Sequence, residues 1–344
     1  MTKKSIFFIL IIFNLLFLGC QNKPNDTLLT EGKWDKLTAI RLEESFINNN
    51  ASAVHEKWKH YPELYTDFYT KMLNMGIEEE LNNDSLINTY VIPNLNLYIT
   101  DSNMRYIFNS IQNEFPDFSY YETEISKGLN RFDHLFNVKT KIGLGTFNSN
   151  FNATVIENDQ IIWIGLDMYL GVNHPIIKLL PNEAIPQYYK NKMDKKYIVS
   201  DAMFGFLMGR IYEPIGDELL SKMLAYGKIA YVIDLILPME ERENTFRYTR
   251  AELDWCENHE EEIWKTLVDN SLLYEKDPSK TNPFFSDGPY TKNFGKESPS
   301  NIGIWIGYKI IKDYVNHNKI STQEINKIIS EKDIQKLLRT YDPY

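Results

Sequence analysis

Histidine is the residue whose spacing tests most directly for metal chemistry, because two imidazoles at helical spacing bind zinc. The chain has six, at positions 55, 60, 134, 174, 259 and 317. His259 is followed by Glu260, but Ile263 stands where the second ligand would be. Cys256 lies three residues before His259, but two ligands do not make a site, so we interpret them as a packed thiol and a surface histidine. The sequence predicts no metal site and no cofactor.

Nucleophilic and phosphate-binding patterns are also missing. Cys256 has no recognisable base to activate it, and no Gly-x-Ser-x-Gly elbow occurs. Gly143 and Gly145 are more simply interpreted as glycines of a β-strand than as part of a phosphate-binding loop. We therefore predict no catalytic residue.

Charged residues inside or beside apolar segments are the remaining candidates. They are Asp201, Arg210, Glu213, Asp217 and Glu218. A buried charge must be paired or solvated, so an ion pair of Arg210 with Glu213 or Asp217 is the simpler interpretation. The alternative is that these residues line a cleft that binds a partner. Asp167 has the same two interpretations, the simpler being that it caps the end of a hairpin.

The elements that would position these residues fall into three parts. Helical periodicity dominates residues 32–137, including an apolar stripe over 37–47. A period of two over 138–171 predicts a small mixed or antiparallel sheet, with a turn at Asn158-Asp159. Helices return over 175–340, among them buried helices at 200–212 and 217–237, while 276–300 resembles a long loop. With no linker found after residue 31, we predict one domain of mostly helical α+β class over 32–344.

The N-terminus resembles a bacterial lipoprotein signal. Lys3 and Lys4 precede an apolar run that ends in Phe17-Leu18-Gly19-Cys20, which is similar to a lipobox. We expect residues 1–19 to be removed, Cys20 to carry the lipid, and 20–31 to form a polar tether. Two acyl chains would hold the protein at a membrane surface, which we expect to be periplasm-facing. The formal charge of −10 becomes −12 without the signal, which disfavours nucleic acid as a partner.

Three segments resemble the gliding motility lipoprotein GldB family of Bacteroidetes over essentially the whole mature chain. They are residues 164–171, residues 217–228, and residues 303–311. The resemblance implies a membrane-anchored part of the gliding apparatus, whose partners are other gliding or secretion proteins of the envelope.

That family in turn resembles zinc peptidases of zincin-like fold, which bind zinc through two histidines on a helix and a downstream Glu. The corresponding helix here, residues 200–212, has no histidine, and Tyr226 stands where the Glu would be. We expect a protein that is not an enzyme, in which Tyr226 joins the candidate cleft residues. Two rivals stay open: a metallopeptidase with an atypical site using residues such as Asp201, Glu213, Glu218 or His174, and a lipoprotein that captures a small ligand.

Overall fold

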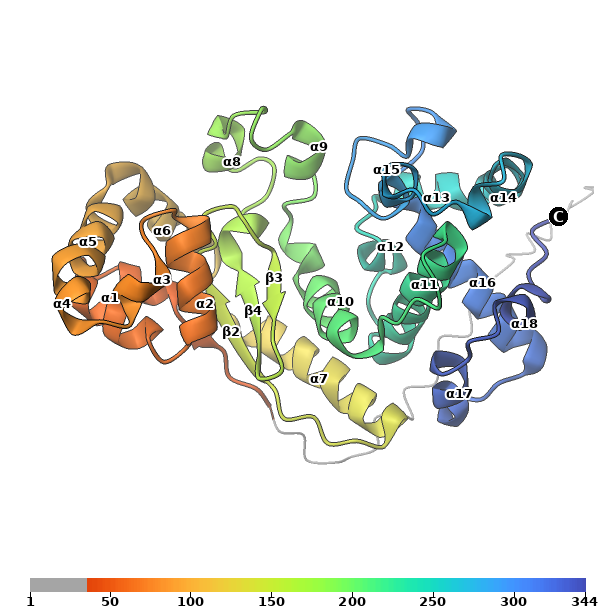
Figure 1. The fold of residues 1–344 in the computed structure, drawn as a ribbon, viewed down its shortest axis with the longest axis horizontal. Helices are drawn as coiled ribbons and strands as arrows, with labels where there is room; N and C mark the ends of the chain where they lie inside the picture. The colour runs from red at the N-terminus through yellow and green to blue at the C-terminus, as the bar shows by residue number, and fades with distance from the viewer. Residues whose placement is uncertain (1–35) are drawn as a thin grey trace, which may run out of the picture.

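A four-stranded mixed sheet lies between the N-terminal and the C-terminal helices of the computed structural model, which describes residues 36–344 (Figure 1). The predicted signal peptide, Cys20 and the tether lie outside the described residues. The strand order is β1-β2-β4-β3. Strands β1 and β4 both run parallel to β2, and β3 runs antiparallel to β4. The bounds are β1 (Ile40–Arg41), β2 (Gly143–Phe147), β3 (Val155–Glu157) and β4 (Ile161–Gly165). The predicted mostly helical α+β class with a small mixed sheet is confirmed.

The turn between β3 and β4 forms where the sequence placed it. The side chain of Asn158 accepts hydrogen bonds from the N–H groups of Gln160 (3.0 Å) and Ile161 (2.8 Å). Such a side-chain turn is a common reason for Asn at a hairpin. The hairpin makes β3 an edge strand, since no other strand in the described part of the chain pairs with it.

Side chains on the two faces of the sheet belong to two different apolar clusters. Phe147 and Trp163 point into a cluster shared with the N-terminal helices, whereas Leu144, Ile162 and Ile164 point into the larger cluster of the C-terminal helices. This alternation follows the period of two in a strand, and burial on both faces is typical of parallel strands.

The N-terminal helices pack around a group of aromatic rings that includes Phe46, Trp58, Phe68, Tyr98 and Phe108. Two of these helices, η3 and η4, have the wider π-helical turn. The elements are η2 (Glu43–Phe46), α1 (Ala51–Trp58), α2 (Pro62–Thr66), η3 (Asp67–Met72), α3 (Glu78–Leu81), α4 (Asp84–Leu86), η4 (Ile87–Val91), α5 (Ile92–Thr100) and α6 (Ser102–Glu114).

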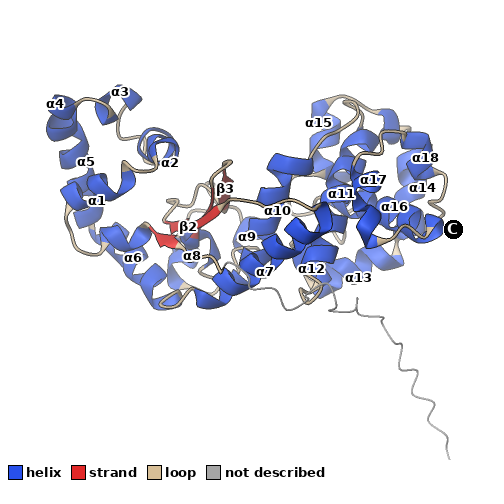
Figure 2. Cartoon of the chain, turned by 90° about the horizontal axis from the view of Figure 1, so that it is seen from below, coloured by secondary structure: helices blue, strands red, loops and turns tan. Residues whose placement is uncertain are grey.

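The C-terminal helices begin against the other face of the sheet, where α7 (Ser119–Phe136) and α10 (Ile198–Ile211) pack on each other. They continue to the far end of the molecule, away from the N-terminal helices (Figure 2). The long pair α11 (Leu219–Ile236) and α16 (Ile302–Asn318) forms the most extensive helix contact. The predicted buried helices at 200–212 and 217–237 correspond to α10 and α11.

Shorter elements complete this part. They are η5 (Leu166–Tyr169), α8 (Pro175–Leu179), α9 (Gln187–Lys190), η6 (Lys195–Tyr197), α12 (Arg242–Thr245), α13 (Arg250–Asn258), α14 (Glu260–Asp269), η7 (Leu272–Tyr274), α15 (Pro278–Thr281), η8 (Asn282–Phe284), η9 (Lys292–Phe294), η10 (Thr322–Glu324), α17 (Ile325–Ile329) and α18 (Ile334–Leu338). None of the helices in residues 36–344 has the length and apolar character needed to cross a membrane.

Two predictions of local structure are wrong. The stripe over 37–47 is not one helix, because Ile40 and Arg41 pair with Gly145 and Thr146 and add a strand to the sheet before the short helix η2 begins. Residues 276–300 are not a plain loop, because α15, η8 and η9 form within them. In both cases tertiary contacts decide the conformation of a short apolar or Pro-rich segment. The periodicity of the sequence does not predict such contacts.

Candidate functional site

A pocket of about 270 Å³ lies beside the edge strand β3, between α10, the segment after α12 and the segment that leads into α16. Its walls combine aromatic rings with buried charges. The lining residues are Thr154, Val155, Asp201, Phe204, Gly205, Thr245, Phe246, Arg247, Phe285, Asp287, Asn301 and Ile304. The edge strand β3 and α10 lie side by side in Figure 1, and Gly205 lets them approach, since a Cβ at that position would lie 2.8 Å from a methyl group of Val155.

A carboxylate and a guanidinium face each other in this pocket. Asp201, in the first turn of α10, accepts a hydrogen bond from the Tyr169 hydroxyl (2.8 Å) and lies 3.6 Å from Nη1 of Arg247. Burial raises the pKa of Asp201, while Arg247 and the Tyr169 hydroxyl work in the opposite direction. Burial alone would lower the pKa of Arg247, but the charges of Asp201 and Asp287 outweigh it and raise that pKa. The 3.6 Å separation makes the two side chains an ion pair.

A second ion pair joins the pocket-lining residue Asp287 to Lys192. The ammonium group of Lys192 lies 3.1 Å from Oδ1 of Asp287 and donates to the Ser300 hydroxyl at 2.8 Å. Two carboxylates thus meet two cations, and the charges of the pocket balance. A ligand with a strong net charge would have to break one of these pairs.

Two buried polar atoms of pocket-lining residues have no partner. They are Nε of Arg247, a donor, and Oδ1 of Asn301, an acceptor. The Asn301 residue is only 7% exposed, so water does not simply replace the missing bond at its surface. Native proteins rarely leave such atoms unpaired.

The sequence-based candidates are only partly brought together. Asp201 lines the pocket. Tyr226 lies behind it, stacked on the rings of Phe204 and Phe285 at centroid distances of 6.2 Å and 4.9 Å. Asp167 is far from solvent and caps the segment after β2, where it accepts from the N–H of Ser149 (2.7 Å) and of Phe151. It follows the simpler capping interpretation.

The other charged candidates point elsewhere. The expected partner of Arg210 is wrong: its guanidinium pairs with Glu157 on β3, not with Glu213 or Asp217. Glu213 pairs with Lys332 (2.7 Å) at the surface. Glu218 pairs with Lys276 (2.8 Å), and Asp217 is exposed. Arg210 is in α10, whereas the three acidic residues are in the connection to α11, so their side chains point to different parts of the molecule although they are close in sequence.

The residues named for a metal centre also have other roles. His174 caps α8 by accepting from the N–H of Ile176 (3.2 Å). The His259 ring faces the Trp255 carbonyl (2.7 Å), and Cys256 is fully buried. Among residues 36–344, no three His, Cys, Asp or Glu side chains gather closely enough to hold a metal ion.

Sequence reasoning missed Lys192, Arg247, Asp287 and Asn301. The predicted long loop over 276–300 could have pointed to two of them. Asp287 lies inside that segment, and Asn301 directly follows it. Nothing local marks Arg247, which reaches the pocket through a left-handed backbone conformation (φ 55°) after α12.

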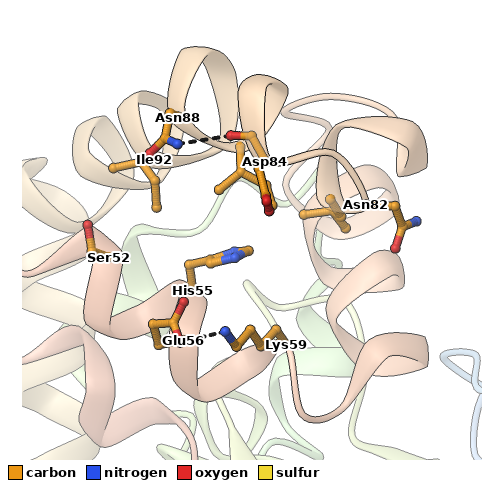
Figure 3. A pocket seen from close by; sticks show the side chains of 10 residues that line it. Ser52, His55, Glu56, Lys59, Asn82, Asp84, Asn88 and Ile92 are labelled. Atoms are coloured by element: carbon orange, nitrogen blue, oxygen red, sulfur yellow. Dashed lines mark hydrogen bonds and ion pairs between the residues drawn. The ribbon is translucent and has the colours of Figure 1, made fainter.

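A second hollow lies among the N-terminal helices, with a volume of about 500 Å³ (Figure 3). His55 on α1 faces Asp84 and Asn88 across it, and Glu56 pairs with Lys59 at its rim. The ring of His55 is hydrogen-bonded to the Tyr65 hydroxyl (3.0 Å), and burial lowers its pKa. No side-chain atom that lines this hollow is among the buried unpartnered ones found in the described residues, so it is a weaker candidate.

The fold and the pocket define a mostly helical α+β protein with a charge-balanced pocket beside an edge strand. The chain belongs to the GldB family, because the family model described as gliding motility protein GldB matches residues 25–343. This membership links the chain to gliding motility and to the membrane-anchored lipoproteins of the cell envelope. No curated protein and no solved structure matches the chain.

Proposed function

We propose that this chain is a catalytically inactive component of the gliding apparatus that acts by binding other gliding or secretion proteins. It does so while anchored to the envelope membrane through Cys20, with its domain facing the periplasm. The observation that supports binding without catalysis is the ion pair at the centre of the pocket. Asp201 is paired with the guanidinium of Arg247, and a fixed cation at that position disfavours a second cation such as a metal ion.

The scaffold we propose is zincin-like. Helix α10 takes the place of the metal-binding helix, lies against the sheet beside the antiparallel edge strand β3, and packs on α11. The side chain of Tyr226 on α11, where a zinc peptidase has its downstream Glu, is stacked on the rings of Phe204 and Phe285 instead. A peptidase cleft that has lost its metal-ligating side chains would keep its shape and remain available for binding a partner.

Deletion of the gene in its host tests this function. Cells without it should fail to spread and glide, and the full chain supplied in trans should restore both. Cells that still move normally after deletion would contradict the role in motility.

Elemental analysis of the purified full chain tests the absence of catalysis through a metal. We expect no stoichiometric zinc. Zinc bound at one equivalent and lost on substitution Glu218→Gln or His174→Ala would instead support the atypical metallopeptidase.

A further inference from the structure

We infer that the domain touches the head groups of an anionic membrane with the connection between α7 and β2, residues 137–142. We call this segment the contact edge. The inference rests on the proposed function, because it assumes the lipid anchor at Cys20. Three features of the described residues support it: an exposed valine held in a tight turn, two lysines without acidic partners, and the position of the first described residues beside them.

The turn that presents Val138 is fixed by Asp133. Asn137 ends α7 with a left-handed backbone (φ 52°), and the N–H of Val138 donates to the Asp133 carbonyl (3.0 Å). The carboxylate of Asp133 accepts from the N–H of Thr140 (3.0 Å). At a helix end of this kind, the residue in the place of Val138 often packs on an apolar side chain in the place of Asp133. Because that side chain is a carboxylate here, Val138 stays 50% exposed.

Two lysines follow this valine in the contact edge. Lys139 and Lys141 are both exposed, and no carboxylate oxygen of residues 36–344 lies within 4.0 Å of either ammonium group. Nearby carboxylates have other partners, since Asp133 bonds to the main chain and Glu122 lies 3.7 Å from the ammonium group of Lys36. An exposed apolar side chain beside unpaired cations suits the boundary between phosphate head groups and acyl chains. The chain as a whole has a formal charge of −10 and is repelled by anionic lipid, so contact through this edge also orients the domain.

The first described residues lie beside the contact edge. The N–H of Leu37 donates to the Ser126 hydroxyl on α7 (2.9 Å). Leu37 and Lys139 line the same small hollow, which has a volume of about 220 Å³. In Figure 1 the start of the coloured chain and the connection after α7 both lie along the lower edge of the molecule. The segment that leads to the lipid therefore joins the domain next to the unpaired lysines.

The anchor makes a weak contact at this edge sufficient. The fifteen residues between Cys20 and Lys36 span at most roughly 55 Å when fully extended. A surface confined in this way experiences a high effective concentration of lipid, so contacts that are weak on their own become populated. Each lysine close to an anionic surface strengthens binding about fivefold, so the two lysines together contribute about thirtyfold.

A fluorophore that responds to solvent polarity, attached at Val138→Cys, tests the contact. The full chain is lipidated in cells, purified in detergent and reconstituted into vesicles of phosphatidylcholine, either alone or with about one third phosphatidylglycerol. With Cys20 lipidated and Cys256 buried, only position 138 reacts with the label. Val268→Cys is the matched control, since Val268 is 45% exposed and belongs to α14, which lies away from the contact edge in Figure 1.

We expect the fluorescence of the probe at position 138 to be at least about twofold higher in the vesicles with phosphatidylglycerol than in the neutral ones, and the probe at position 268 to be unaffected. Lys139→Glu combined with Lys141→Glu should abolish the increase. Salt at about 1 M should do the same, because it screens the attraction. Lys292→Glu combined with Lys296→Glu is the control for net charge, since both lysines are exposed and have no carboxylate oxygen of residues 36–344 within 4.0 Å. This control should leave the increase unchanged.

Three results would overturn the inference: no increase at position 138, an equal increase at position 268, or an increase that survives the double substitution at positions 139 and 141. Flotation of the vesicles on a density gradient separates this inference from the proposed anchor. If the chain floats with neutral vesicles but the probe does not respond to anionic lipid, the anchor stands and the contact edge falls. If the chain floats with neither kind of vesicle, the anchor falls, and the contact edge falls with it.

Discussion

Gly227 and Gly307 face each other where α11 crosses α16. A Cβ built on Gly307 would lie 3.2 Å from the Cα of Gly227 and would overlap the main-chain carbonyl of Met223. A Cβ on Gly227 would in turn overlap the carbonyl group of Gly307. The two helices that form the centre of the C-terminal core therefore pack backbone against backbone.

We predict that Gly307→Ala lowers the free energy of unfolding by about 2–3 kcal/mol, since the overlap with rigid main chain exceeds the gain in helix propensity. Urea titration followed by circular dichroism measures the change. Gly128→Ala in α7 is the control, because its Cβ would meet only flexible side chains at 3.1–3.3 Å, so its effect should stay below about 1 kcal/mol. Equal losses in both variants would contradict this account of the crossing.

The pair of Arg210 with Glu157 should matter more than that of Lys332 with Glu213. The side chains of the first pair are 24% and 10% exposed, and those of the second are 62% and 71% exposed. We expect Glu157→Gln to lower the free energy of unfolding by about 1–2 kcal/mol and Glu213→Gln to have a much smaller effect. Chemical denaturation of both variants checks this, and a larger effect at Glu213 would be evidence against the pairing.

Asp167 should make stability depend on pH. Burial raises its pKa from 3.8 to about 6, although hydrogen bonds from Ser149 and Phe151 oppose the rise. The folded state then binds a proton more tightly than the unfolded state, so this group stabilises the protein at low pH. Its contribution is lost as pH rises from about 4 to above 6.

Comparison with Asp167→Asn isolates this contribution from other titrating groups. The free energy of unfolding of the wild type relative to the variant should fall by about 2 kcal/mol between pH 4.5 and pH 7. Urea titrations at the two pH values provide the measurement. A difference that is constant or that increases with pH would show that Asp167 is not the titrating group.

Cys20 should carry the lipid. In cells fed with labelled palmitate, Cys20→Ser should lose the label, leave the membrane fraction and fail to restore gliding in a deletion strain. Cys256→Ala serves as the control, because that thiol is buried in the core and should not affect labelling. Label that persists in Cys20→Ser would move the attachment point elsewhere.

The sequence predicted much of the fold and little of the site. Helices of mostly apolar residues, such as α10 and α11, were predicted from the sequence, as was the turn at Asn158. The strand at Ile40 was not, since two residues are too short to show a period. The division into signal, tether and one domain stays a prediction.

The sequence by itself determined the longer helices, the turn at Asn158 and the family to which the chain belongs, because periodicity, turn residues and family motifs are local properties. Only the tertiary structure decided which charges meet. Arg247 faces Asp201 across 46 positions of sequence, and Lys192 faces Asp287 across 95. Ion pairs of this kind depend on where whole helices pack, and side-chain chemistry alone does not specify that geometry. For the same reason, Arg210 was assigned to acidic residues close in sequence and instead lies beside Glu157 on the sheet.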